Sequence, residues 1–142
     1  MINGTVLFVC VHNAGRSQMA EGIFNHLAAA RGLAVRAESA GTLGGKALNP
    51  MAVEAMREIG IDIASQAPKL LTQVMSDRAT RIITMGCGVD ADACPARILV
   101  SEDWGLDDPA GAPIEKVREV RDQIRVRVEA LLEEWADRQE QP

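Results

Sequence analysis

With 142 residues, of which 47% are hydrophobic and 25% charged, the chain has the size and composition of one globular domain and not of a disordered protein. We expect that domain to span residues 1–142. The formal net charge of −5 and the aromatic content of only 3% disfavour binding to nucleic acids or to an anionic membrane surface. The first apolar run, Thr5–Val11, is too short to span a membrane and lacks the flanks of a secretory signal, so a cytoplasmic location is expected.

Strand-like and helix-like patterns alternate in the first half of the chain. The continuous apolar run Thr5–Cys10 predicts a strand that is buried on both faces. Apolar residues at helical spacing predict a helix over Ser17–Arg31, and a second strand is expected over Ala34–Ser39. An Asn-Pro pair followed by an apolar stripe predicts a helix over residues 50–59.

The alternation continues in the second half. Lys69–Ser76 is a weaker helical candidate. Two short aliphatic runs, Arg81–Met85 and Ala96–Val100, predict two more buried strands. A long amphipathic helix is expected to close the chain, because apolar residues recur there at steps of three and four: Val117, Val120, Ile124, Val128, Leu131 and Trp135.

This order of elements predicts an α/β fold, a three-layer αβα sandwich around a four-stranded parallel sheet. In such sheets, ligands bind in the loops beyond the carboxyl ends of the strands. The loops of interest therefore follow Cys10, Met85 and Val100. All three cysteines of the chain and a pair of adjacent carboxylates lie in or beside these loops.

The loop after the first strand has the composition of an oxyanion cradle. A bound anion would meet backbone N–H groups and the positive end of the following helix, and the fork of Arg16 matches two oxygens of a tetrahedral oxyanion. The same positive field favours the thiolate form of Cys10, and Ser17 can donate a hydrogen bond to that sulfur. We therefore expect Cys10 to act as a nucleophile and the oxyanion to be bound by Val11, His12, Asn13, Ala14, Gly15, Arg16 and Ser17.

Three residues of this region also have structural interpretations. Asn13 is expected to hold the loop in shape, because its side chain can bond to nearby backbone and it tolerates unusual φ values. His12 is expected to belong to the loop surface and not to act as a base. Cys10 would alternatively be a small buried residue that ends a strand, an interpretation that the strand–loop–helix setting disfavours.

Four stretches of the chain carry a family resemblance: CVHNAGRSQMAEG at 10–22, ESAGT at 38–42, NPMAVEAM at 49–56 and EDWGLDDPAG at 102–111. Together they resemble the low-molecular-weight phosphatase superfamily, and most closely its arsenate reductase branch. The likeness spans nearly the whole chain. Its most specific part is the combination of the Cys10–Arg16 loop with Cys87 and Cys94.

The two downstream cysteines favour redox chemistry. Cys87 follows the third predicted strand, whose end reaches the same sheet edge as Cys10, so its thiol would be placed for disulfide exchange, whereas phosphoryl transfer needs Cys10 alone. A Cys87–Cys94 disulfide requires Cα atoms within about 7 Å, and seven helical steps span ~10 Å, so the segment must be a loop or must unwind. Two alternatives remain: both cysteines are structural, or the three thiols bind a metal or arsenite.

A pair of adjacent carboxylates, Asp107 and Asp108, follows the fourth predicted strand. The resemblance points to Asp108 as the general acid that protonates the departing oxygen. Pro109 restricts the backbone of Asp108 and would aim the carboxylate. The alternative is an ordinary surface turn, since Asp before Pro is common in turns.

The resemblance implies that the chain reduces arsenate to arsenite, in arsenic detoxification, with thioredoxin as the reductant. Cys10 would attack arsenate, Cys87 would attack Cys10, and Cys94 would attack Cys87. The resulting Cys87–Cys94 disulfide would be reduced by thioredoxin. No cofactor and no metal are expected, because relatives that hold a monovalent cation beneath the loop carry an acidic residue where Lys69 stands here. The chain is expected to act as a monomer.

Two other functions stay open. A protein tyrosine phosphatase on the same scaffold would use Cys10 to form a phosphocysteine, although phosphatase relatives flank the acid loop with tyrosines and this chain has no Tyr. A non-catalytic protein would instead use the three thiols as ligands for an oxyanion or for arsenite.

Overall fold

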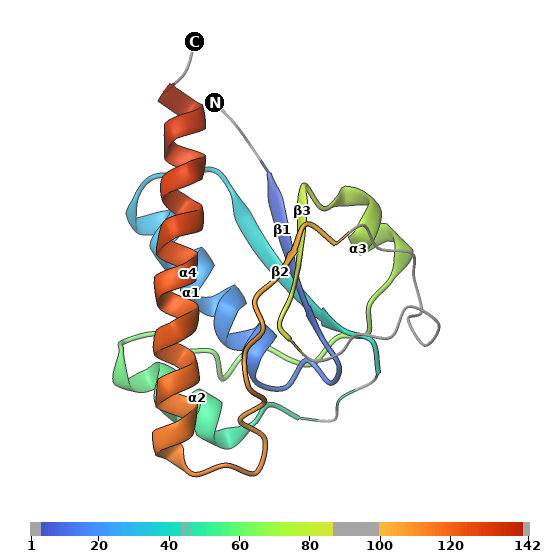
Figure 1. Cartoon of the computed structure of the whole chain (residues 1–142), viewed down its shortest axis with the longest axis vertical. Helices are drawn as coiled ribbons and strands as arrows, with labels where there is room; N and C mark the ends of the chain where they lie inside the picture. Colours follow the sequence, from blue (N-terminus) through green and yellow to red (C-terminus); the bar gives the residue numbers. More distant parts are fainter. Residues whose placement is uncertain (1–3, 44, 46, 87–99, 141–142) are drawn as a thin grey trace.

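The computed structural model describes residues 4–43, 45, 47–86 and 100–140 (Figure 1). The elements in chain order are β1 (Thr5–Cys10), α1 (Arg16–Ala30), β2 (Arg36–Gly41), α2 (Pro50–Glu58), α3 (Gln73–Arg78), β3 (Arg81–Thr84), β4 (Glu102–Asp103) and α4 (Ile114–Glu140). The predicted α/β fold is confirmed. Five of the predicted elements agree closely with β1, α1, α2, β3 and α4.

The four strands form one parallel sheet in the order β2-β1-β3-β4. Cys10 at the end of β1 pairs with Gly41 at the end of β2, and Val9 pairs with Thr84 at the end of β3. Thr84 in turn pairs with Asp103 of β4. The carboxyl ends of all four strands therefore meet at one edge of the sheet, as a parallel arrangement requires.

The sheet separates two apolar cores. Along β1 the side chains alternate between the faces: Val6, Phe8 and Cys10 belong to the larger core, and Leu7 and Val9 to the smaller one. Helices α1, α2 and α4 cover the larger core, and α3 lies on the other side of the sheet (Figure 1). This is the predicted three-layer arrangement, and it directs the Cys10 side chain toward α1.

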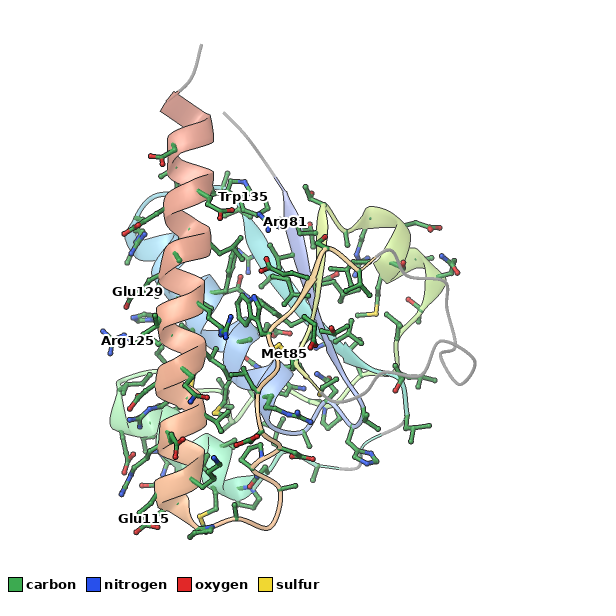
Figure 2. The ribbon with its side chains drawn as sticks, in the orientation of Figure 1. Arg81, Met85, Glu115, Arg125, Glu129 and Trp135 are labelled. Atoms are coloured by element: carbon green, nitrogen blue, oxygen red, sulfur yellow. The ribbon has the colours of Figure 1, made fainter. Side chains whose placement is uncertain are left out.

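Aromatic side chains fill the larger core. Phe8 lies with its ring centroid 6.1 Å from that of Phe24 and 5.3 Å from that of Trp104. Trp135 of α4 meets Phe24 edge to face at 6.5 Å, and Figure 2 shows it between the helix and the sheet. Each such pair contributes about 0.5–1.5 kcal/mol beyond the burial of its area.

The two shorter helices begin at side-chain caps. Asn49 Oδ1 accepts a hydrogen bond from the Met51 N–H at 2.9 Å, and Pro50 occupies the first turn of α2. Thr72 Oγ1 accepts from the Met75 N–H at 3.2 Å, so α3 begins at Gln73. The helix predicted over Lys69–Ser76 was therefore placed too early, because the backbone at 69–71 pairs with Gly41 instead.

Two strands were also misplaced in sequence. The second strand is Arg36–Gly41, two residues later than predicted. Of the predicted fourth strand, residues 96–99 lie outside the described residues, and Val100 is not in a strand; the observed β4 is Glu102–Asp103. Its side chains are polar because Glu102 bonds to Arg81 and Asp103 to Thr84, so no apolar pattern marks this edge strand.

The last helix is long but amphipathic. Val117, Val120, Ile124 and Val128 are buried, while charged residues occupy most of the positions between them. Within the part of the chain that the structure describes, no helix combines the length and the apolar character needed to cross a membrane.

Candidate active site

A small cavity opens at the carboxyl end of β1. Its volume is about 70 Å³, and it is lined by Cys10, Val11, His12, Ala14, Gly15, Arg16, Asn49, Asp108 and Ala110. Pockets for drug-sized ligands have volumes of about 300–1,000 Å³. The cavity is therefore suited to a small ion held between the β1–α1 loop and the loop that carries Asp108.

The Cys10 sulfur lies at this cavity and is surrounded by hydrogen-bond donors. Cys10 is 4% exposed. Its Sγ lies 2.9 Å from Ser17 Oγ, and the Asn13 backbone N–H donates to it at 3.2 Å. The hydrogen bond expected between Ser17 and the sulfur is thus present. Polar contacts of this kind are what a thiolate nucleophile requires in a buried position.

The end of β2 fixes the shape of the cradle loop. The Thr42 N–H donates to Cys10 O at 3.0 Å, and the Leu43 N–H donates to Val11 O at 2.8 Å. A Cβ on Gly41 would lie only 2.6 Å from Val11 O, so this position has no room for a larger residue. Asn13, fully buried, has a φ of 55°, in the left-handed region that asparagine tolerates. The sequence-based expectation for Asn13 agrees with this geometry.

Arg16 connects the cradle to the loops after β3 and β4. The side chain is only 6% exposed. Its Nη1 donates to Met85 O at 3.1 Å and to Leu106 O at 2.9 Å. Its Nη2 lies 3.6 Å from Asp108 Oδ2. The guanidinium is therefore held on one side by backbone carbonyls and faces the cavity and a carboxylate with the rest of the fork.

The adjacent carboxylates Asp107 and Asp108 have different surroundings. Asp108 lines the cavity of Cys10, is 57% exposed, and accepts a hydrogen bond from the Ala110 N–H at 2.9 Å. Asp107 does not line this cavity. It accepts a hydrogen bond from Lys116 Nζ at 2.8 Å, and this bond and charge lower the pKa of Asp107 and raise the pKa of Lys116. Of the two, only Asp108 lines the cavity of Cys10, and both line a larger hollow beside it.

A second, larger hollow of about 480 Å³ adjoins the first and shares Val11, His12, Arg16 and Asp108 with it. Its remaining lining includes Gly86 and Asp103. Asp103 Oδ1 accepts hydrogen bonds from the Gly86 N–H and from Thr84 Oγ1, both at 2.7 Å.

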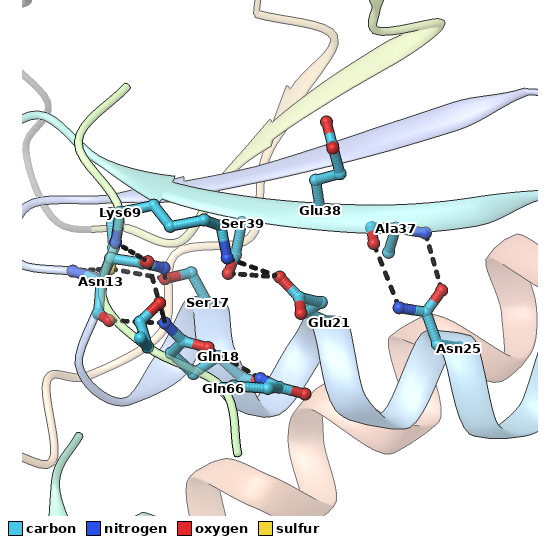
Figure 3. A network of polar contacts seen from close by, with 12 residues as sticks. Asn13, Ser17, Gln18, Glu21, Asn25, Ala37, Glu38, Ser39, Gln66 and Lys69 are labelled. Atoms are coloured by element: carbon cyan, nitrogen blue, oxygen red, sulfur yellow. Dashed lines mark hydrogen bonds and ion pairs between the residues drawn. The ribbon is translucent and has the colours of Figure 1, made fainter. Parts of the chain in front are cut away.

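Beneath the loop, a charged pair lies behind the cradle (Figure 3). Glu21 Oε1 accepts from Ser39 Oγ at 2.8 Å and lies 3.3 Å from Lys69 Nζ. The Lys69 backbone N–H donates to Asn13 Oδ1 at 2.8 Å. Among the described residues, no group of three or more His, Cys, Asp or Glu side chains is arranged to hold a metal ion.

The structure brings together most of the residues singled out in the sequence, but not all. Cys10, Arg16 and Asp108 line one cavity, while Ser17 lies behind the sulfur. Cys87 and Cys94 lie outside the described residues. Sequence reasoning took Asn49 only for a helix cap and missed Gln18 altogether. Asn49 also lines the cavity, and its N–H donates to Ala14 O at 2.8 Å.

Comparisons with known proteins agree with this geometry. Residues 5–141 match the low molecular weight phosphotyrosine protein phosphatase family. The sequence is 35% identical over 131 residues to an arsenate reductase of Staphylococcus aureus, covering 91% of this chain and 96% of that protein. It is 38% identical over 128 residues to the glutaredoxin arsenate reductase of a Synechocystis species, covering 89% of this chain and 95% of that protein. A solved thioredoxin-dependent arsenate reductase of Corynebacterium glutamicum superposes with a TM-score of 0.73 at 36% identity, over 92% of this chain and 61% of that one.

Proposed function

The chain belongs to the low molecular weight phosphotyrosine protein phosphatase family, and within this family we propose that it reduces arsenate to arsenite. The observation that carries the proposal is a cysteine thiol in an ion-sized cavity bounded by Arg16 and Asp108, in a chain 35% identical to an arsenate reductase over most of its length. We place the reaction in the cytoplasm, where thiols are kept reduced.

In the first step, the thiolate of Cys10 attacks arsenic. The backbone N–H groups of the loop and the Arg16 fork bind the arsenate oxygens and stabilise the charge that develops on them. A sulfur–arsenic bond forms, and one oxygen leaves as water after it takes a proton from Asp108. Arsenic remains in its pentavalent state in this adduct, so the electrons must come from a second thiol.

In the second step, the thiolate of Cys87 attacks the sulfur of Cys10. A Cys10–Cys87 disulfide forms, and the electron pair of the sulfur–arsenic bond stays with arsenic, which leaves as arsenite. Cys94 then attacks Cys87, expelling the Cys10 thiolate and leaving a Cys87–Cys94 disulfide. These two steps rest on the sequence positions of the cysteines and on the resemblance.

We propose thioredoxin as the reductant that restores the dithiol. Relatives named for thioredoxin and for glutaredoxin both exist. A relay that ends in an internal disulfide is matched to a dithiol protein, which reduces it by the same exchange chemistry and becomes oxidised itself. The two further cysteines of this chain supply such a relay.

A coupled assay tests the proposal. Consumption of NADPH is followed in the presence of thioredoxin, thioredoxin reductase and arsenate, with phosphate and tellurite as decoy oxyanions and with glutaredoxin and glutathione as the alternative reductant. We expect arsenate-dependent turnover with thioredoxin that is lost in Cys94→Ser. Equal turnover of Cys94→Ser and wild type would exclude the relay.

A phosphatase is the second candidate, because the described site contains everything that phosphoryl transfer to a cysteine needs. Cys10, Arg16 and Asp108 suffice for that reaction, and phosphate and arsenate are close in shape and charge. The small cavity and the lack of any tyrosine disfavour an aromatic phosphoester as the main substrate. Cys94→Ser separates the two candidates: the relay requires that arsenate turnover is lost, whereas hydrolysis of p-nitrophenyl phosphate, which needs Cys10 but not Cys94, should be unchanged.

A further inference from the structure

Two buried amide side chains lie directly behind the cradle loop, Asn13 and Gln18, both with no exposed surface (Figure 3). Neither Gln18 nor its outer neighbour Gln66 lines the cavity of Cys10. Main-chain groups offer only an N–H donor or a C=O acceptor. Where an amide side chain meets such groups, its orientation is fixed, so the direction of each hydrogen bond can be followed.

The orientation of Gln18 is set by backbone carbonyls. Its Nε2 lies 3.0 Å from Asn13 O and 3.0 Å from Ala67 O, which only accept, and 2.9 Å from Asn13 Oδ1. Its Oε1 accepts from Gln66 Nε2 at 2.7 Å. Gln66 Nε2 also donates to Gln18 O at 3.2 Å, which fixes the amide of Gln66 as well.

The orientation of Asn13 follows from the same logic. The Lys69 N–H can only donate, so the atom it meets at 2.8 Å must be Asn13 Oδ1. Nδ2 of Asn13 therefore faces Ser17 and donates to its Oγ at 2.7 Å. Cys10 Sγ lies 2.9 Å from Ser17 Oγ, and when Cys10 is a thiolate, which has no hydrogen to give, the Ser17 hydroxyl is the donor in this bond.

The network also holds the backbone of Asn13 in the left-handed region, at a φ of 55°. Asparagine tolerates this conformation better than most residues with a side chain, and contacts from its surroundings help to maintain it. It is the conformation in which the Asn13 N–H reaches Cys10 Sγ at 3.2 Å. Gln18, which bonds to both the carbonyl and the side chain of Asn13, is the side chain best placed to maintain it.

We propose that Gln18, supported by Gln66, is a positioning residue for the nucleophile: it holds Asn13 so that the Asn13 N–H and the Ser17 hydroxyl both donate to the Cys10 sulfur. Gln18 acts through Asn13 and touches neither the sulfur nor the oxyanion. The inference rests on the proposed role of Cys10 as a nucleophile, but not on which oxyanion it attacks.

The test measures alkylation of Cys10 by iodoacetamide as a function of pH. Cys87 and Cys94 are replaced by serine in every protein, so that only one thiol reacts. Gln18→Met keeps the approximate side-chain volume and removes the amide, and Gln73→Met, on the exposed surface of α3, is the matched control. The charged or titratable groups that line the cavity, His12, Arg16 and Asp108, and the Glu21–Lys69 pair behind the loop stay unchanged throughout.

For Gln18→Met we expect roughly tenfold slower alkylation at neutral pH, the order of one hydrogen bond to a charged group, and a pH midpoint of alkylation displaced upward. Gln73→Met should react like the parent. A purely structural role for Gln18 would lower the melting temperature and leave the alkylation profile unmoved, and that result would overturn the proposal.

A second variant keeps the proposal testable if Gln18→Met does not fold. Gln66→Met removes the outer support and leaves Gln18 in place, so alkylation should slow by roughly threefold, the order of one neutral hydrogen bond; an unchanged rate in this variant would also count against the proposal. Because alkylation needs no arsenate, the two proposals fail separately: if the protein with all three cysteines did not reduce arsenate while Gln18→Met still altered the alkylation profile, the proposed function would be refuted and this inference would stand.

Discussion

Arg16 and Asp108 form an ion pair whose partners differ sharply in exposure: Nη2 lies 3.6 Å from Oδ2, with Arg16 6% exposed and Asp108 57% exposed. An ion pair with one exposed partner contributes little to stability. We propose that Asp108 leaves Arg16 when an oxyanion takes its place and then acts at the cavity as the proton donor. The buried arginine is fixed by two backbone carbonyls and binds charge without having to reorganise.

The first prediction separates the two adjacent carboxylates. Asp108→Asn should slow arsenate reduction by roughly a hundredfold or more, as expected for loss of a general acid, with little change in the melting temperature. Asp107→Asn is the matched control, since its partner is Lys116 and it does not line the cavity of Cys10. Single-turnover release of arsenite by both variants is the measurement. Equal losses in the two variants would remove Asp108 from the proposed role.

The second prediction concerns the geometry of Arg16. Arg16→Lys keeps the charge but cannot donate to Met85 O and Leu106 O while also facing the cavity. We expect kcat/KM for arsenate to fall by about 10²–10³, and urea unfolding to show a loss of about 1–3 kcal/mol from the unsatisfied carbonyls. Arg78→Lys, half exposed on α3, is the control and should stay within about 0.5 kcal/mol of wild type. A fully active Arg16→Lys would show that the forked guanidinium group is not needed to bind the arsenate oxygens.

The third prediction concerns the contact between β2 and the cradle. Gly41→Ala places a methyl group 2.6 Å from Val11 O, a backbone atom that moves only with the loop. Gly15→Ala adds the same methyl group with its nearest neighbour at 3.8 Å. We expect Gly41→Ala to reduce Cys10 alkylation and arsenate turnover more than Gly15→Ala does. Circular dichroism should confirm that both variants fold; a larger loss in Gly15→Ala would contradict the steric argument.

Much of this site was predictable because its residues follow strands with strong apolar patterns. The run Thr5–Cys10 gave β1 its correct bounds, and the Cys-to-Arg loop then had to lie at the carboxyl edge of the sheet. Asp103 and Glu102 could not be predicted as a strand, since their side chains pair with polar groups of β3 and carry no apolar signal. The start of α3 was missed because Lys69 and Leu71 bond to the backbone of Gly41, a contact distant in sequence.

Gln18 illustrates what sequence reasoning could not find. A glutamine in the first turn of a helix is ordinarily a solvated residue, and nothing in its neighbours indicates burial. Its amide bonds to Asn13 of the adjoining loop and to Gln66 and Ala67, which lie 48 and 49 residues away in the chain. Only the three-dimensional structure shows that both the nitrogen and the oxygen of its amide are hydrogen-bonded.

The fourth prediction concerns acid stability. The hydrogen bond from Arg118, with further contributions from Arg121, lowers the pKa of Glu58. A lowered folded-state pKa adds stability above the ordinary carboxyl pKa of about 4.3, and that stability is lost as pH falls through the folded value. The free energy of unfolding of wild type should therefore exceed that of Glu58→Gln at pH 7, and the difference should shrink in acid. Glu54→Gln on the same helix is the control, and a difference independent of pH would contradict the assignment.

In the proposed relay, oxidation passes from Cys10 to the other two cysteines, and mass spectrometry after one equivalent of arsenate follows this transfer. Fully reduced protein is treated without any external reductant, and its remaining thiols are alkylated and mapped. We expect one equivalent of arsenite and a protein that has lost two hydrogens, with Cys87 and Cys94 joined by a disulfide. In Cys94→Ser we expect a trapped Cys10–Cys87 disulfide. Three alkylated thiols and no arsenite would contradict the relay.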